Sequence, residues 1–402
     1  MDGGMDSQTK RAGGSWLWII IIVFILVVGG YFILGLINQD KDSTTTKSVS
    51  TGEKITILQK TLLNKFGFLG GGADDTGDGI VEKGGAWVRP HPGAFVWDMM
   101  QESKDGEIDF SFSDTEVKNY GKNNLGIVAT IWPFAAWDQK NLVNAADCKV
   151  ESNDGFLPKN DKKGRGSYLP EYRCNPSDWM AYQTFVQKVV ERYDGDGIED
   201  MPDLTMPIKF WEIMNEPDLQ YQNNMAPKDG SNSLNFYKQG PDEYAQLLIK
   251  TSEPIRLADP EAKILIAGAA GADERMLRFY QGVFTNKDTL TAFDIGNIHC
   301  ISNDQKTNDF NVAPYKSMLE KAGAPGKPIW VTEAEAMYSS VAEENFLSTK
   351  KSTEGAISAG AQRIFYTRDQ FDDMRTDMSQ KSDGGTYPSV EKFQELFGEF
   401  TK

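Results

Sequence analysis

The chain has 402 residues, of which 40% are hydrophobic, and this length suffices for one large domain or two ordinary ones. Its formal net charge is -16. Binding of nucleic acid requires clustered Lys and Arg that neutralise phosphates, so the acidic balance argues against nucleic acid as a partner. Partners without phosphate groups are favoured instead.

The first 54 residues divide into three segments. Segment 15–38, SWLWIIIIVFILVVGGYFILGLIN, has no charged side chain and is long enough to cross the ~30 Å hydrocarbon of a bilayer. A cleaved signal peptide would have a shorter apolar stretch and a small-residue cleavage site, so we predict an uncleaved transmembrane signal anchor. A tail, 1–14, precedes it, and a polar stalk rich in Ser and Thr, 39–54, follows it. We expect a single-pass membrane protein whose globular domain lies outside the cytoplasm.

Residues 55–402 alternate short apolar runs with longer segments of helical periodicity, a pattern typical of βα units and a parallel sheet. We predict eight strands, at 66–69, 86–89, 126–131, 208–214, 263–267, 294–299, 329–332 and 363–366. Eight strands with helices between them predict a (β/α)8 barrel. The alternative is an open doubly wound sheet, but FLGGGADDTGDG after the first strand lacks the G-x-G-x-x-G spacing and carries aspartates that would repel a pyrophosphate.

Two glutamates follow predicted strands at corresponding positions. Glu216 comes after the fourth strand in WEIMNEPD, and Glu333 comes after the seventh in IWVTEAE. The active site of such a barrel is built at the carboxyl ends of its strands, so we expect both side chains at the barrel mouth. Cleavage of a glycosidic bond needs two carboxyls, because one protonates the leaving oxygen and the other attacks the anomeric carbon or activates water. Either glutamate taken alone could be a solvated residue of a loop or helix start.

The segments WEIMNEPD and IWVTEAE resemble the acid/base and nucleophile segments of the clan A retaining glycoside hydrolases, (β/α)8 enzymes that include cellulases, mannanases and β-xylosidases. The resemblance extends over residues 66–366. It implies that Glu216 is the acid/base, Glu333 the nucleophile and Asn215 a hydrogen-bond partner of the sugar 2-hydroxyl. It also implies that Arg89 neighbours the nucleophile and keeps it ionised. His299 matches the family's histidine at the end of the sixth strand.

Two departures from the family pattern leave a second hypothesis open. Many relatives have His-x-Tyr on the sixth strand, where this chain has His299-Cys300-Ile301, and many end the eighth strand with Trp, where this chain has Tyr366. We expect hydrolysis of a β-linked oligo- or polysaccharide by double displacement, with no cofactor required for catalysis. The alternative is a membrane-tethered carbohydrate-binding protein with a weakened or inactive glycosidase-like site.

Further substrate contacts are predicted at the same mouth. Sugar rings pack on flat aromatic faces while their hydroxyls seek polar groups, so Trp137 is a candidate platform. The family resemblance implies a substrate contact for Tyr366 as well, at the position where many relatives have a Trp platform. Ordinary packing accounts equally well for Trp137. His91 lies two residues after Arg89 and could contact substrate, or could be a loop histidine without such a role.

A separate acidic loop, DGDGIEDMPD, interleaves carboxylates with glycines. Calcium takes oxygen ligands from alternate residues of such loops, so we predict a structural calcium site held by Asp194, Asp196, Asp200 and Asp203. The loop resembles those of thrombospondin type 3 repeats and dockerins but lacks the closing glutamate of an EF-hand. A solvated acidic turn is the alternative.

The three cysteines leave two interpretations open. Cys148 and Cys174 bracket a polar loop and could pair outside the cell, while Cys300 follows a buried-looking strand. Sequence spacing does not show whether two Cα atoms lie within bonding range, so three free thiols are the alternative.

Overall fold

The computed structural model of the protein describes residues 60–72, 74–160, 164–220, 234–301, 307–335, 342–367 and 390–400. The predicted tail, transmembrane segment and stalk lie outside these residues. Among the residues that the structure describes, no helix combines the length and the apolar character that crossing a membrane requires. Every element below belongs to the compact unit Thr51–Lys402.

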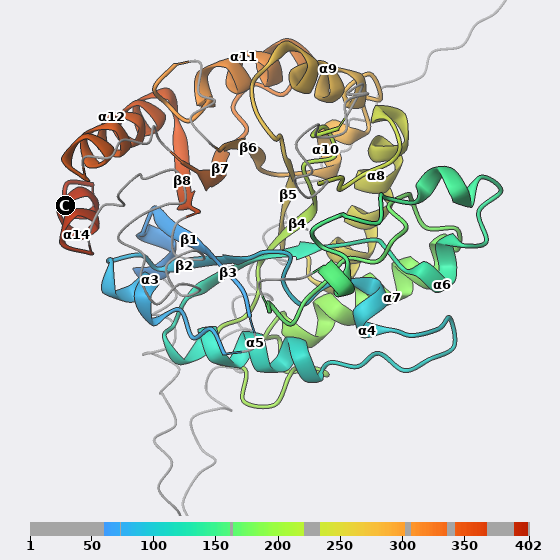
Figure 1. The fold of residues 1–402 in the computed structure, drawn as a ribbon. Coiled ribbons are helices and arrows are strands. Elements are labelled where there is room, and N and C mark those ends of the chain that lie inside the picture. The colour runs from blue at the N-terminus through green and yellow to red at the C-terminus, as the bar shows by residue number, and fades with distance from the viewer. Residues whose placement is uncertain are drawn as a thin grey trace, which may run out of the picture. The chain divides into compact units, whose positions relative to one another are not determined.

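Eight parallel strands form one sheet in the order β5-β4-β3-β2-β1-β8-β7-β6 (Figure 1). Their bounds are β1 Phe66–Gly70, β2 Trp87–Pro90, β3 Gly126–Ile131, β4 Phe210–Asn215, β5 Lys263–Gly268, β6 Gly296–Cys300, β7 Ile329–Ala334 and β8 Ala361–Tyr366. Parallel bridges Leu265–Ile295 and Ala269–Ile298 join the two ends of this order, so the sheet closes into a barrel. The predicted (β/α)8 architecture is confirmed, and no strand end differs from its predicted position by more than two residues.

Helices surround the strands (Figure 1). Their bounds are α3 Asp78–Glu82, α4 Trp97–Met100, α5 Ser111–Lys122, α6 Ala136–Gln139, α7 Trp179–Tyr193, α8 Pro241–Ala258, α9 Glu274–Val283, α10 Thr289–Ala292, α11 Val312–Ala322, α12 Ala342–Ala359 and α14 Val390–Gly398. In α7 the carboxylate of Asp178 accepts from the backbone N–H of Ala181 (3.0 Å), which satisfies a donor that the helix itself leaves unpaired. The apolar stripe of α7, including Phe185 and Val189, is buried against the barrel.

The barrel interior is layered, because alternate residues of each strand face inward. One layer is apolar and consists of Trp87, Val128, Leu265, Ile295, Trp330 and Phe365, with the partly buried Phe210 packed against it. Two residues further along five of the strands, the inward positions are polar and buried: Arg89, Thr130, Glu212, Asn297 and Thr332. The strands therefore deliver a buried polar layer to the carboxyl end of the barrel, directly above its apolar base.

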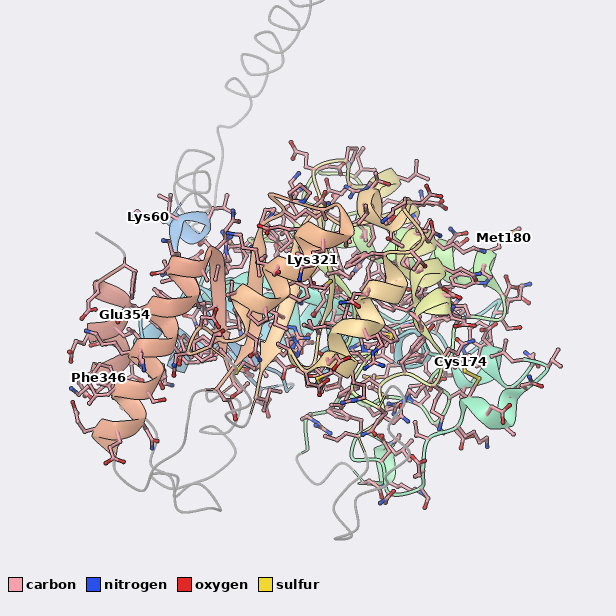
Figure 2. The ribbon with its side chains drawn as sticks, turned by 90° about the horizontal axis from the view of Figure 1, so that it is seen from above. Lys60, Cys174, Met180, Lys321, Phe346 and Glu354 are labelled. Carbon is pink, nitrogen blue, oxygen red and sulfur yellow. A yellow bond between two sulfur atoms is a disulfide. The ribbon has the colours of Figure 1, made fainter. Side chains whose placement is uncertain are left out.

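A long connection between β3 and α7 carries two short 3-10 helices, Ala145–Cys148 and Pro158–Asn160. Within it Cys148 and Cys174 form a disulfide, with Cα atoms 5.3 Å apart, whereas Cys300 is buried at the end of β6. Figure 2 shows Cys174 at the edge of the barrel opposite α12, which carries Phe346. The first of the two cysteine interpretations is therefore the one that the structure adopts.

Candidate active site

Glu216 and Glu333 come together at the carboxyl ends of β4 and β7. One carboxylate oxygen of each lies within 4.8 Å of the other, and both residues are only 5% exposed. The two carboxyls lie ~5–5.5 Å apart in glycosidases that retain the anomeric configuration, and ~6.5–9.5 Å apart in those that invert it. The spacing seen here matches the shorter of these two arrangements.

Arg89 ties this pair to the buried polar layer. Its Nη1 donates to Glu333 Oε1 (2.8 Å), its Nη2 to Asn215 Oδ1 (2.6 Å) and its Nε to Glu212 Oε2 (2.7 Å). The guanidinium is fully buried, so these contacts are charge-assisted hydrogen bonds in a dry environment. The structure thus places Arg89 beside Glu333, as expected, and adds Glu212, a residue that the sequence reasoning missed.

The backbone is strained on both sides of Asn215. Met214 has φ 71° and Glu216 has φ 42°, a left-handed region that costs non-glycine residues about 1–3 kcal/mol each. This conformation interrupts the alternation of β4. As a result, Asn215 reaches Arg89 while its neighbour Glu216 reaches His299 in the same interior. Strict alternation would have pointed one of the two away.

An irregularity in β7 has the same effect on Thr332 and Glu333. Ile298 of β6 pairs with Val331, but the next residue, His299, pairs with Glu333, so two residues of β7 oppose one step of β6. Such a bulge re-aims successive side chains. Both Thr332 and Glu333 therefore contact interior groups of the barrel.

His299 bridges the two sides of the site. Its Nδ1 lies 2.7 Å from Glu216 Oε1 and 3.7 Å from Glu333 Oε1, and its Nε2 lies 2.8 Å from Thr332 Oγ1. Burial lowers the pKa of His299 to about 4, so the ring is neutral near pH 7. Gly268 makes room for this ring, because a Cβ at that position would lie 2.0 Å from Nε2.

Environment separates the two carboxyls. Burial raises the pKa of Glu216 to about 7, and the more distant Arg89 opposes that rise. Burial also raises the pKa of Glu333, but the Arg89 guanidinium donates directly to this carboxylate and opposes the shift. Glu216 is therefore the carboxyl that holds a proton near neutral pH, and Glu333 is the one paired with a cation.

Two predicted platform residues lie elsewhere. Tyr366 is buried, its hydroxyl shares a hydrogen bond with Thr353 Oγ1 (2.7 Å) and its ring packs on Phe397. The reason is strand alternation: Phe365 faces the barrel interior, so Tyr366 faces the helices. The interpretation of Tyr366 as a sugar platform beside the glutamates is therefore corrected.

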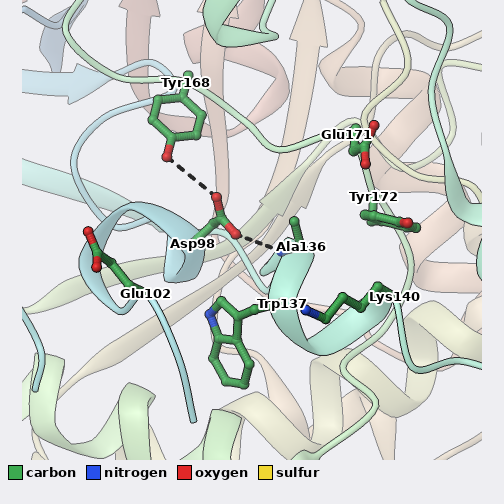
Figure 3. A pocket seen from close by; sticks show the side chains of 8 residues that line it. All are labelled: Asp98, Glu102, Ala136, Trp137, Lys140, Tyr168, Glu171 and Tyr172. Atoms are coloured by element: carbon green, nitrogen blue, oxygen red, sulfur yellow. Dashed lines mark hydrogen bonds between the residues drawn. The ribbon is translucent and has the colours of Figure 1, made fainter. Parts of the chain in front are cut away.

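Trp137 lies on α6, where its ring packs on Trp97 and its Nε1 donates to the carbonyl of Gln101 (2.8 Å). It lines a pocket of about 400 Å³ together with Asp98 and Tyr168 (Figure 3). The lining of this pocket includes neither of the two site glutamates. Trp137 therefore lines a pocket separate from the site of Glu216 and Glu333.

His91 is buried in an aromatic cluster. Its ring lies edge-on to Phe156 and Phe236 and tilted against Trp132, with ring centroids 5.3 to 6.0 Å apart. This cluster sits where β2 and β3 leave the barrel. Within the part of the chain that the structure describes, no hydrogen bond joins His91 to Glu216 or Glu333.

The acidic loop groups its carboxylates differently from the prediction. Asp194 and Asp196 lie within 4.8 Å of Glu191, and burial raises the pKa of Asp194 to about 6. Asp200 instead accepts backbone N–H groups from within the loop, and the Asp203 side chain is 83% exposed, 3.8 Å from a lysine. Calcium binding by these residues stays a prediction.

Residues 191–356 match the family model described as the glycosyl hydrolase catalytic core. This segment contains Glu216, His299 and Glu333, so the residues that meet in the structure fall within it. The part of the barrel that carries the glutamate pair is thus similar to glycosyl hydrolase catalytic cores. A search of curated protein sequences finds no match.

Solved structures share the fold at low sequence identity. A glucosidase from Croceicoccus marinus has a TM-score of 0.56 and 15% identity, over 84% of this chain and 68% of that one. A monomeric β-xylosidase from Caulobacter crescentus has a TM-score of 0.52 and 15% identity, over 87% and 65%. A family 39 glycoside hydrolase from Bacteroides cellulosilyticus has a TM-score of 0.54 and 13% identity, over 85% and 65%. The chain thus spans about two thirds of these proteins.

Proposed function

We propose that the protein is a retaining O-glycosyl hydrolase that cleaves β-linked oligo- or polysaccharides by double displacement. The observation that carries this proposal is the approach of Glu216 and Glu333, whose oxygens lie within 4.8 Å at the barrel mouth. Inverting enzymes need a wider gap, because a water molecule must fit between the base and the sugar. The match to a glycosyl hydrolase catalytic core supports the reaction class.

Each carboxyl has one task in each step. In the first step Glu333 attacks the anomeric carbon, the glycosidic bond breaks, and the departing oxygen takes the proton of Glu216. In the second step water attacks the same carbon, gives a proton to Glu216 and releases Glu333. Arg89 stabilises Glu333 whenever it carries negative charge. Two carboxyls and water complete this cycle, so the chemistry needs no cofactor.

Asn215 offers the donor that the sugar requires. Its Oδ1 accepts from Arg89, which turns its amide nitrogen away from the guanidinium. Nδ2 is buried and has no hydrogen-bond partner among the described residues. A buried donor left unpaired costs about 1–3 kcal/mol, and a substrate hydroxyl next to the reacting carbon would satisfy it. This agrees with the predicted role of Asn215 at the sugar 2-hydroxyl.

The experiment is a screen of the full-length protein on chromogenic β-glucosides and β-xylosides and on plant and microbial polysaccharides. These two glycosides come first because the structural neighbours include a glucosidase and a β-xylosidase. Hydrolysis by the wild type that Glu216→Gln and Glu333→Gln both lose supports the proposal. Binding of the same sugars without turnover would instead support the carbohydrate-binding alternative.

The pH profile follows from the proton on Glu216. Since the acid must be protonated to act and its pKa is about 7, kcat/KM is expected to fall above pH 7, tenfold for each further pH unit. On the acid side, kcat/KM is expected to decline as Glu333 becomes protonated, because Glu333 must be ionised to attack. A bell-shaped profile of kcat/KM on a chromogenic substrate checks this. A rate that stays constant up to pH 9 contradicts the assignment of Glu216.

We further propose that segment 15–38 anchors this domain to a membrane, on the side away from the cytoplasm. The support is the uncharged length of that segment and the Cys148–Cys174 disulfide, since disulfides persist in oxidising compartments. Full-length protein is expected to stay with the membrane fraction after an alkaline carbonate wash, whereas a chain that begins at residue 55 is expected in the supernatant. Release of the full-length protein by carbonate would contradict the anchor.

A further inference from the structure

Glu212 lies at the base of the site, and each of its two carboxylate oxygens accepts two hydrogen bonds. Its Oε2 accepts from Arg89 Nε and from Thr130 Oγ1 (both 2.7 Å), and its Oε1 accepts from Asn297 Nδ2 (2.6 Å) and the Gly268 N–H (3.3 Å). An ionised carboxylate is an acceptor only, so it fixes the orientation of the amide. Asn297 must point its nitrogen at Glu212 and its oxygen away.

The next link is Thr332, whose hydroxyl has a single proton. Asn297 Oδ1 can only accept, and Thr332 Oγ1 lies 2.8 Å from it, so the hydroxyl donates its proton there. The same oxygen lies 2.8 Å from His299 Nε2 and must accept at that contact. Nε2 of His299 therefore carries a hydrogen.

A neutral imidazole has one N–H, so a hydrogen on Nε2 leaves Nδ1 as an acceptor. Glu216 Oε1 lies 2.7 Å from Nδ1. Two acceptors cannot share this contact, and neither the imidazole nor its other partners can supply the missing proton. The hydrogen between them must come from Glu216.

We propose that the hydrogen bonds of this chain of groups, the relay (Glu212, Asn297, Thr332 and His299), all point in one direction. This direction makes Glu216, not Glu333, the group that carries the acid proton. The relay residues are positioning residues, because they act through Glu216. The proposal rests on the proposed function for the use made of that proton, but the location of the proton is a property of the folded protein by itself.

Other titratable groups also interact with Glu216 and are not members of the relay. They are Arg89, Glu333, Asp218 and Tyr280. Asp218 accepts from the Ala270 N–H and lies two residues beyond Glu216. A change at Thr332 leaves each of these groups in place, so it isolates the relay.

Thr332→Val is the test substitution, because it removes the hydroxyl and keeps a similar shape. His299 then loses the acceptor at Nε2, and its hydrogen can move to Nδ1, where it donates to an ionised Glu216. We expect the alkaline limb of kcat/KM to move down by about one pH unit, which lowers the rate about tenfold above pH 8. Thr332→Ser keeps the hydroxyl and is expected to restore the wild-type limb.

A second readout needs no substrate. The chain has two histidines, so the 15N spectrum of full-length protein labelled in histidine contains one set of ring signals for His91 and one for His299. Glu333→Gln leaves both histidines in place and serves to assign the set that responds to the site. At pH 7 we expect His299 to show a hydrogen on Nε2 and a bare Nδ1, and Thr332→Val to shift this balance.

The two readouts keep the proposals distinct. A wild-type spectrum with the hydrogen on Nδ1, or with both nitrogens protonated, overturns the relay even if the protein hydrolyses glycosides. The relay is also overturned if the alkaline limb of kcat/KM stays at its wild-type position in both Thr332→Val and Thr332→Ser. The expected spectrum in a protein that hydrolyses no glycoside would support the relay and remove the proposed function.

Discussion

Replacing Glu333 with alanine is expected to lower kcat/KM on a β-linked chromogenic glycoside by three orders of magnitude or more, about 4 kcal/mol of transition-state stabilisation. The reason is that, in the proposed double displacement, the carboxylate at the end of β7 is the group that bonds to the anomeric carbon. Sodium azide is expected to restore turnover, because its nitrogen attacks the vacated face while the aryl oxide leaves. The product is then the α-glycosyl azide.

The matched control is Glu320→Gln, a glutamate on α11 that is exposed. It removes the same charge far from the paired carboxyls and is expected to leave kcat/KM within twofold of the wild type. Retention of more than a tenth of the wild-type rate in Glu333→Ala would contradict the role of Glu333. A β-glycosyl azide would show instead that a nucleophile still acts in the first step.

Replacing Arg89 with methionine is expected to lower the free energy of unfolding by about 3–5 kcal/mol, the usual cost of removing one partner of a buried ion pair. Two carboxylates, on Glu212 and Glu333, lose their buried cation at once. Urea denaturation followed by tryptophan fluorescence measures the change. The control is Arg278→Met, whose partner Glu274 is 91% exposed, and there we expect less than about 1 kcal/mol.

The loss at Arg89 is expected to depend on pH. Loss of the guanidinium removes one of the interactions that oppose the burial-driven rise in the pKa of Glu333, so the folded protein holds that proton more tightly than the unfolded chain does. A group of this kind contributes stability at low pH that is lost as the pH rises through its folded pKa. The deficit of the variant should therefore be larger at pH 8 than at pH 5. An equal deficit at both values would mean that lost packing, not charge, dominates.

The order of the barrel strands and the pair of glutamates could be predicted because both follow from local patterns. Apolar runs end in polar residues, and the carboxyl ends of parallel strands share one face. Glu212 was also within reach, because a glutamate inside the apolar run FWEIMN is unusual unless it is paired. Its partner Arg89, on a strand more than a hundred residues earlier, was not readable from that run.

Local irregularities explain what the sequence did not reveal. The bulge in β7 turns Thr332 inward beside Glu333, and the positive φ of Glu216 lets Asn215 and Glu216 both reach groups of the barrel interior. Neither distortion has a sequence signal in Thr-Glu or Asn-Glu-Pro. Tyr366 shows the converse, because regular alternation in β8 buries it on the outer face of the barrel.

Arg89 is the main support of the Glu333 carboxylate. Position 301, where many relatives have a tyrosine, holds a half-buried isoleucine. Among the residues that the structure describes, the Glu333 carboxylate contacts Arg89 Nη1 at 2.8 Å and His299 Nδ1 at 3.7 Å. The Glu333 carboxylate therefore relies on the guanidinium and on His299, and we expect activity to depend strongly on Arg89.

In the proposed mechanism, two carboxyls at the barrel mouth carry out two successive displacements at one carbon. Proton NMR during the first minutes of hydrolysis of a β-linked glycoside distinguishes this mechanism from a single displacement, because the anomeric proton of the newly released sugar reports its configuration before mutarotation. We expect the β-anomer to appear first and the α-anomer only later. Release of the α-anomer first would show a single displacement and contradict it.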